Sequence, residues 1–330
     1  MGGDHGVSCV VNGIERSLRI NQNLFFLIHG DENTLTQQIK VHPKLSNYCR
    51  IISCTSIVKM DEKPSNALRS GKGTSMWSCL NSLSKGEADI ALSCGNTGAL
   101  MAMSMMQLRK APGVNRPAIA ILWPSINERG FNIVLDAGAD IKADAEDLLQ
   151  YALMGAEYAR NGFNISTPRV GLLNVGVEDH KGRIELQEAS LLIRQAEKNM
   201  GHFHFLGFVE GSDIPSANVD IIVTDGFTGN VALKTGEGTA SLIKNFLKTS
   251  FETSTIAKIG GLFSMSALRK LNKKIDPRNV NGGIFLGLNG VVIKSHGGAD
   301  EIGIAAAINL AFQLESTGFA KKLSSKFNPL

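Results

Sequence analysis

The chain has 330 residues, of which 43% are hydrophobic and 19% are charged, which is long enough for one large domain or two modest ones. Its formal net charge of +4 is mild, and it holds three tyrosines and two tryptophans, so we expect no nucleic-acid partner. We expect no signal peptide and no membrane-spanning run, and because the five cysteines lack metal-binding spacing we predict a cytoplasmic protein with reduced thiols.

Short apolar runs alternate along the chain with amphipathic segments. Several runs are apolar on both alternating faces, as strands are when helices cover both sides of a sheet. The predicted strands are 24–30, 50–56, 89–93, 118–124, 132–138, 169–176, 203–209, 220–224 and 290–297. The predicted helices are 64–85, 97–110, 144–161, 186–199, 229–252 and 298–318. This order predicts an α/β fold with a mostly parallel sheet, in a single domain over residues 1–330.

Residues 254–276 break this alternation. Apolar residues recur there near helical spacing, and they are accompanied by the basic residues Lys258, Arg269, Lys270, Lys273 and Lys274. The pattern predicts a protruding amphipathic helix. Such a helix lies either on a membrane surface or against another helix, in the same chain or in a dimer. The sequence slightly favours the packed helix, because solvated basic faces are common.

Two stretches of the chain share a strand followed by a glycine turn. "DIALSCGNTG" (89–98) and "DIIVTDGFTG" (220–229) align without a gap, and a helical segment follows each. Glycine permits positive φ and the close approach of a ligand, and backbone N–H groups at a helix start bind anions. We predict an anion-binding role for the pair. For either copy alone, an ordinary helix capped by threonine explains the pattern about as well.

The second copy carries more polar residues. Asp225 precedes its turn, Asn230 follows it, and Lys234 lies one helical turn further on. Polar, glycine-rich tails also follow three other predicted strands, at 136–144, 174–182 and 293–300. Because α/β folds bind ligands at the carboxyl edge of the sheet, we expect both turns and these tails to converge on a single cleft.

Familiar catalytic motifs do not occur in the chain. It has no P-loop, no Gly-x-Gly-x-x-Gly after a strand, no Gly-x-Ser-x-Gly elbow and no His-x-x-x-His pair. Cys94 adjoins the first turn and is conceivable as a thiolate nucleophile, but nothing nearby marks a base for it. We therefore predict no cofactor and no metal site.

Six segments together resemble one family. They are "MGGDH", "SCGNTGALM", "DLLQYALMG", "PRVGLLNVGVEDHKG", "TDGFTGNVALKTGEG" and "VIKSHGGAD". They are similar, and in the same order, to signature segments of PlsX, the bacterial phosphate acyltransferase family, from Met1 to about Phe312. Members usually begin with an apolar strand and "DAM" before "GGD", so the resemblance implies that one strand and its aspartate are absent here.

The resemblance implies an enzyme that converts fatty acyl-acyl carrier protein (acyl-ACP) and inorganic phosphate to acyl phosphate and ACP. The product feeds the first acylation of glycerol 3-phosphate in phospholipid synthesis. It also implies a three-layer α/β/α fold related to isopropylmalate dehydrogenases and phosphotransacetylases. The expected protein is a cytoplasmic homodimer that can associate peripherally with the membrane.

This chemistry needs no covalent nucleophile, because phosphate is already an anion and the thiol of a thioester is a fairly acidic leaving group. The enzyme has to hold phosphate against the carbonyl carbon and stabilise the oxyanion. For phosphate and the acyl-phosphate carbonyl we predict Asn96, Thr97, Gly98, Thr228, Gly229 and Asn230.

Charged residues complete the predicted site. Lys181, and with it Lys234, is expected to neutralise phosphate, and His296 to donate to the departing thiolate. Asp4 and Asp225 are expected to orient these groups. The hypothesis predicts that Lys181→Ala lowers turnover and leaves the fold intact. Because ACP is acidic, Arg269, Lys270, Lys273 and Lys274 are predicted to contact ACP or, alternatively, anionic lipid.

Two other functions stay open at this point. An NAD-dependent oxidoreductase of the isopropylmalate dehydrogenase type shares the expected fold, but it needs metal-binding aspartates and a nucleotide site that the sequence does not display. A non-catalytic scaffold that binds ACP and membrane is the second alternative. The density of polar strand ends argues against that scaffold.

Overall fold

Strands and helices alternate along most of the chain, as the sequence predicts. The computed structural model describes residues 2–275 and 282–319, without the side chains of residues 262 and 269–275. The strands are β1 (Phe26–Gly30), β2 (Cys49–Ser53), β3 (Ile90–Ser93), β4 (Ala118–Pro124), β5 (Phe131–Leu135), β6 (Arg169–Leu173), β7 (His204–Val209), β8 (Ile221–Val223), β9 (Gly283–Leu286) and β10 (Val291–Lys294). The α-helices are α1 (Gly6–Leu18), α2 (Glu32–Val41), α3 (Pro64–Ser70), α4 (Ser75–Ser84), α5 (Thr97–Leu108), α6 (Ala145–Phe163), α7 (Ile184–Met200), α8 (Gly226–Glu252), α9 (Thr255–Ile275) and α10 (Glu301–Ser316).

Two parallel blocks of strands run in opposite directions within the central sheet. Among the described residues, this sheet has the order β3-β10-β9-β4-β5-β8-β6-β7, and β1 pairs separately with β2. β3 is parallel to β10, and β5, β8, β6 and β7 are parallel to one another. Between the blocks, β9 is antiparallel to β10 and β4, and β4 is antiparallel to β5. β3, β4 and β10 therefore end at one edge, the β10 edge, and β5 to β8 end at the opposite β8 edge.

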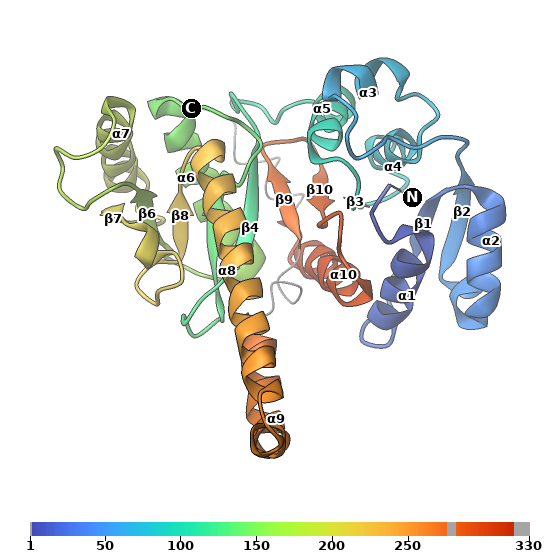
Figure 1. Cartoon of the computed structure of the whole chain (residues 1–330). Coiled ribbons are helices and arrows are strands. Elements are labelled where there is room, and N and C mark those ends of the chain that lie inside the picture. The colour runs from blue at the N-terminus through green and yellow to red at the C-terminus, as the bar shows by residue number, and fades with distance from the viewer. Residues whose placement is uncertain (1, 276–281, 320–330) are drawn as a thin grey trace.

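Helices cover both faces of this sheet. Successive strand residues point to opposite faces, so Val134 packs beneath α8 while Leu135 packs with Tyr151 of α6. α4 and α5 lie on the same face as α8, and α6, α7 and α10 lie on the other. The predicted three-layer α/β/α arrangement is confirmed (Figure 1).

Several elements differ from the sequence-based expectation. α1 was not predicted, because its N-cap residue His5 makes no side-chain capping bond and the sequence therefore lacks a helix-start signal. Gly13 of this helix packs tightly against Ile304 of α10. The predicted helix 64–85 divides into α3 and α4, and Thr74 caps the second by accepting from the Trp77 N–H at 3.3 Å. α2 and the short strand β9 were also not predicted.

α8 runs along one face of the sheet and continues past it. Figure 1 shows that its second half and α9 extend beyond the rest of the molecule. We call residues 239–275 the α8–α9 hairpin. Gly261 of α9 lies close to Phe251 of α8, since a Cβ there would be 3.0 Å from the ring. Within the described ranges, no helix has the length and apolar composition that crossing a bilayer requires.

Candidate functional site

The two copies of the glycine turn lie at opposite edges of the sheet. The first follows β3 and leads into α5, whereas the second follows β8 and leads into α8. β3 and β8 point in opposite directions, because three successive pairings between them are antiparallel. The expectation that both turns and all the polar strand ends converge at one edge is therefore wrong.

Packing, rather than positive φ, explains the glycines of both turns. A Cβ at Gly226 or Gly229 would lie 1.9 Å from the carbonyl oxygen of Asp140 or Asp136, respectively. In the first copy, a Cβ at Gly98 would lie 2.8 Å from Cγ of Pro64. None of these glycines has positive φ. The start of α8 is thus pressed against the loop 136–140, and larger residues are excluded there.

A neutral side chain caps α5. Asn96 Oδ1 accepts from the Ala99 N–H at 2.9 Å, and Nδ2 donates to the carbonyl oxygens of Met60 and Glu62 at 2.8 and 2.9 Å. The side chain predicted to bind phosphate is therefore engaged in joining α5 to the preceding loop. The N–H groups of Thr97 and Gly98, the first two helical residues, have no intrahelical acceptor and carry the positive end of the helix dipole.

A carboxylate caps α8. Asp225 Oδ1 accepts from the Thr228 N–H at 2.7 Å, and Oδ2 forms an ion pair with Arg183 at the start of α7. Burial raises the pKa of Asp225, but its bonds from Thr228 and Arg183 outweigh burial and hold the pKa below its usual value. The N-terminus of α8 thus already holds a paired negative charge.

Four polar side chains from separate parts of the chain meet at the β10 edge. Asp4 precedes α1, and Lys234 lies on α8. Lys294 is the last residue of β10, and His296 lies two residues after it. The Asp4 N–H donates to the carbonyl oxygen of Gly297 at 2.9 Å, which fixes the start of the chain against this edge. We call these four residues the β10-edge cluster.

His296 and Lys234 face each other as two donors. His296 Nδ1 accepts from the Gly298 N–H at 3.0 Å, so the neutral ring carries its proton on Nε2. Burial, followed by the charge of Lys234, lowers the pKa of His296 below its usual value, so the ring is neutral at pH 7. Lys234 Nζ lies 3.4 Å from that Nε2. Two N–H donors at this separation suit an anionic oxygen that accepts from both.

Lys294 is buried at the end of β10, where it is 9% exposed. Its Nζ donates to the carbonyl oxygen of Ser295. Burial lowers the pKa of Lys294 to about 8, although Cys94 and Asp4 oppose this shift. The cluster therefore holds a lysine that exchanges its proton near neutral pH.

The segment before α1 is seated between the ends of β3 and β10. A Cβ at Gly3 would lie 2.8 Å from Cys94 Sγ, and a Cβ at Gly297 would lie 3.3 Å from Asp4 Oδ2. These contacts bring Asp4 to the cluster and place Thr97, three residues after Cys94, at the same edge. All five cysteines, each among the described residues, are free thiols.

The other predicted site residues occupy different places. Asn230 lies beside Gly138 and, four residues before Lys234, shares its face of α8. Gly229 is buried against the carbonyl of Asp136. Lys181 lies in the loop after β6 and pairs with Glu178 of that loop at 2.8 Å. The structure thus joins Asp4, Lys234 and His296, and it does not join Lys181 to them. Their roles stay predictions.

Sequence reasoning gave no role to two residues that the structure makes prominent. Lys294 ends the strand "VVIK", and a lysine that closes an otherwise apolar buried strand is the signal that identifies it. Asp136 is fully buried, and it accepts from the backbone N–H groups of Ile119, Gly138, Ala139 and Asp140. Asp136 therefore organises the loop on which α8 is seated.

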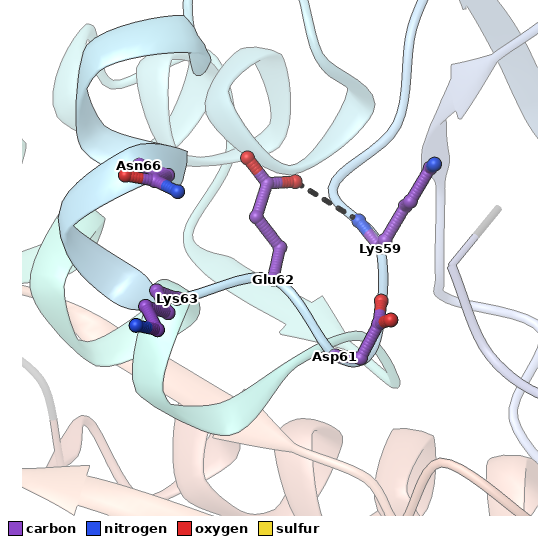
Figure 2. Close-up of a pocket in the computed structure, with 5 residues that line it drawn as sticks. All are labelled: Lys59, Asp61, Glu62, Lys63 and Asn66. Carbon is purple, nitrogen blue, oxygen red and sulfur yellow. Dashed lines mark hydrogen bonds between the residues drawn. The ribbon is translucent and has the colours of Figure 1, made fainter.

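A surface pocket of about 460 Å³ adjoins the start of α5. It is lined by Lys59, Asp61, Glu62, Lys63 and Asn66. Figure 2 shows Glu62 between Lys59 and Lys63, whose amino groups point away from each other. The Asn96 amide joins this loop to α5. The side chains of Arg269, Lys270, Lys273 and Lys274, predicted to contact ACP or lipid, lie outside the described residues.

The family of the chain follows from comparison with known sequences. A family model described as "Fatty acid synthesis protein" matches residues 1–322. A phosphate acyltransferase of Jannaschia sp. (strain CCS1) is 58% identical over 326 residues, which cover 99% of this chain and 89% of that protein. The chain belongs to this family. The family and the class of enzyme, an acyltransferase, are thereby confirmed as the sequence predicted them.

Solved structures share the fold of this family member. A branched-chain phosphotransacylase from Enterococcus faecalis V583 has a TM-score of 0.58 at 12% identity, covering 95% of this chain and 97% of that one. A 4-hydroxythreonine-4-phosphate dehydrogenase from Klebsiella pneumoniae has a TM-score of 0.53 at 10% identity, covering 95% and 97%. At these identities the likeness shows the fold alone, so the dehydrogenase does not favour the oxidoreductase alternative.

Proposed function

We propose that this chain transfers a fatty acyl group from ACP to inorganic phosphate, and that the transfer takes place at the β10-edge cluster. A phosphate oxygen attacks the thioester carbonyl carbon, the carbon–sulfur bond breaks, and acyl phosphate and ACP leave. The name shared by the relatives supports the acyl transfer to phosphate, and the three cationic or donor side chains at one edge support the place.

The observation that carries the proposal is the pair of facing donors, Lys234 Nζ and His296 Nε2, at 3.4 Å. Lys234 also pairs with Glu237 at 2.8 Å, and a phosphate oxygen placed beside Nζ and Nε2 can accept a hydrogen bond from each of them. A phosphate oxygen that accepts from both has its negative charge partly neutralised by Lys234. The neutral His296 adds a hydrogen bond without competing for a proton.

The N-terminus of α5 is the second element of the proposed phosphate site. The cap of α5 is the uncharged Asn96, so its dipole and the N–H groups of Thr97 and Gly98 stay available to an anion. The cap of α8 is the paired carboxylate of Asp225, which repels a phosphate. Of the two glycine turns, we therefore assign phosphate to the first.

Asn230 and Lys234 extend the proposed site along α8. They stand four residues apart on one helix face, so an amide donor lies one turn from the ammonium. The amide suits the carbonyl oxygen of the thioester, which becomes an oxyanion during attack. Asp4, fixed at Gly297, orients the donors of the cluster.

The test is direct formation of acyl phosphate. The protein is incubated with palmitoyl-ACP and phosphate, and acyl phosphate is trapped with hydroxylamine. A parallel reaction without phosphate corrects for direct attack of hydroxylamine on the thioester. We expect phosphate-dependent hydroxamate. A folded protein, verified by circular dichroism, that forms none would overturn the proposal.

The α8–α9 hairpin is the proposed contact with a second copy of the chain. It exposes large apolar side chains along both helices, among them Leu242, Phe246, Ile256 and Phe263. Phe263→Glu is expected to convert a dimer to a monomer in size-exclusion chromatography with light scattering. Ser264→Glu, which adds the same charge to a neighbouring position, is the control. Loss of binding to anionic vesicles, with no change in mass, would instead assign the hairpin to the membrane.

A further inference from the structure

Lys294 has no assigned task in the reaction above. It is 9% exposed at the end of β10, and its Nζ donates to the carbonyl oxygen of Ser295. In the part of the chain that the structure describes, no carboxylate lies within ion-pair distance of this ammonium. A buried ammonium without an ion-pair partner destabilises a fold, so its presence at the site calls for a function.

We propose, on the basis of the function proposed above, that Lys294 is a catalytic residue that gives a proton to the sulfur of the departing thiol. The lysine occupies the end of β10 beside Cys94, at the edge where Lys234 and His296 converge. A group at this position adjoins the place where the thioester carbonyl meets phosphate.

The two neighbouring donors are less suited to release a proton. The neutral His296 ring has one N–H, on Nε2, because Nδ1 accepts from Gly298. Releasing that proton would leave an imidazolate anion, which is unfavourable. Lys234 is half exposed and forms an ion pair with Glu237 at 2.8 Å, so a carboxylate already holds its ammonium. Both residues can hold an anion, but neither is poised to transfer a proton.

The proton affinity of Lys294 matches that of the leaving group. Burial lowers its pKa to about 8, and an unperturbed alkyl thiol has a pKa of about 8.5. General acid catalysis is most effective when the pKa of the acid lies near the operating pH. The groups that act on Lys294 are Cys94, which follows β3, Asp4, and Lys234 of α8. Of these, Lys234 lowers the pKa and the other two raise it.

The proton balance closes within the site. An oxygen of HPO₄²⁻ forms a bond to the carbonyl carbon, and the carbon–sulfur bond then breaks with its electron pair on sulfur. Lys294 gives a proton to this sulfur and becomes a neutral amine. The amine then takes the proton that phosphate carried, so the products are the acyl phosphate dianion and a neutral thiol. The ammonium is restored, and no co-reactant is consumed.

Leaving-group dependence tests this role. Lys294→Met keeps an unbranched side chain of similar length and removes the ammonium group, which carries the proton to be donated. Wild type and variant are compared on two thioesters with the same acyl group, one of N-acetylcysteamine and one of thiophenol. The alkyl thiolate needs a proton to leave, whereas the more acidic aryl thiolate does not. We expect turnover of the alkyl thioester to fall about 100-fold or more, and that of the aryl thioester to fall by less than about tenfold.

Lys234→Met is the matched control, because it removes a cation from the same cluster without removing the proposed acid. It is expected to lower turnover of both thioesters by a similar factor and to raise the KM for phosphate. The forward rate of wild type with palmitoyl-ACP is also expected to fall as the pH rises through about 8, and Lys294→Met is expected to lose this dependence.

The outcomes separate the two proposals. If wild type forms acyl phosphate but Lys294→Met lowers turnover of both thioesters by the same factor, Lys294 is not the acid and the proposed function stands. If wild type forms no acyl phosphate from palmitoyl-ACP, the proposed function fails and the role of Lys294 fails with it. Circular dichroism and thermal unfolding of the variant show that the comparison is made on folded protein.

Discussion

The β8 edge and the β10 edge carry the same short sequence pattern and use it differently. At the β8 edge the glycines admit neighbouring carbonyl groups, and Asp225, the cap of α8, is paired with Arg183. At the β10 edge the cap is the neutral Asn96, and Lys234, Lys294 and His296 gather nearby with Asp4 as the carboxylate of the cluster. A cap whose charge is already paired indicates a structural joint, whereas three donors from separate elements gathered at one edge, one of them the buried Lys294, indicate a place for an anion.

His296→Ala is the change with the largest expected effect, because it removes one of the two facing donors from the β10 edge. Loss of one preorganised donor typically lowers turnover by about 10²–10³-fold. The measurement is the initial rate of hydroxamate formation from palmitoyl-ACP. His204→Ala, at an exposed histidine on β7 that pairs with Glu197, is the control and should retain activity. Full activity of His296→Ala would remove the β10 edge from the mechanism.

Lys294→Met should stabilise the fold while it impairs turnover. The folded pKa of about 8 lies below the 10.5 of an unfolded lysine, so between these values the unfolded chain binds more protons. The destabilisation is therefore complete below pH 8 and is relieved as the pH rises toward 10.5. At 1.36 kcal/mol per pKa unit, the variant should gain up to about 3 kcal/mol at pH 7.

Urea unfolding of Lys294→Met and wild type at several pH values measures this gain. The difference in free energy of unfolding should shrink steadily above pH 8. A difference that does not change with pH would show that packing, rather than the buried charge, separates the two proteins.

Gly229→Ala tests the structural use of the turn at the β8 edge. The added Cβ meets the Asp136 carbonyl, which is held in a loop with little room to move, so we expect a loss of about 2–3 kcal/mol in the free energy of unfolding. Gly238→Ala on the same helix has open space around its Cβ and should instead gain about 1 kcal/mol. Equal effects at the two positions would contradict the close packing of Gly229.

Lys181→Ala should have the smallest effect. The sequence predicted a phosphate contact for this lysine, but the structure pairs it with Glu178 in an exposed loop at the other edge. Exposed ion pairs of this kind contribute little to stability. We therefore expect less than about a threefold change in turnover and little change in the free energy of unfolding. Glu178→Ala should behave alike. A decrease in turnover of more than about tenfold for Lys181→Ala alone would bring the β8 edge into the site.

Local patterns predicted the described strands other than β9, the polar strand ends and the layered fold, because burial and turn chemistry depend on neighbouring residues. The direction of each strand was predicted less well. A short connection separates the predicted strands 118–124 and 132–138, too short for a parallel crossover, and this indicates an antiparallel pair that reverses the sheet. The meeting of Asp4, Lys234 and His296 depends on that reversal. No local pattern predicts that these three residues meet, since they are far apart in the chain.

Two packing contacts of α8, one on each side of Lys234 in the sequence, fix the position of this lysine. Gly229 rests on the Asp136 carbonyl before it, and Gly236 rests on Trp123 after it, where a Cβ would lie 2.7 Å from the indole ring. A line held at two points cannot tilt without moving one of them. We therefore expect a change at Trp123, which is not part of the β10-edge cluster, to shift the ammonium of Lys234.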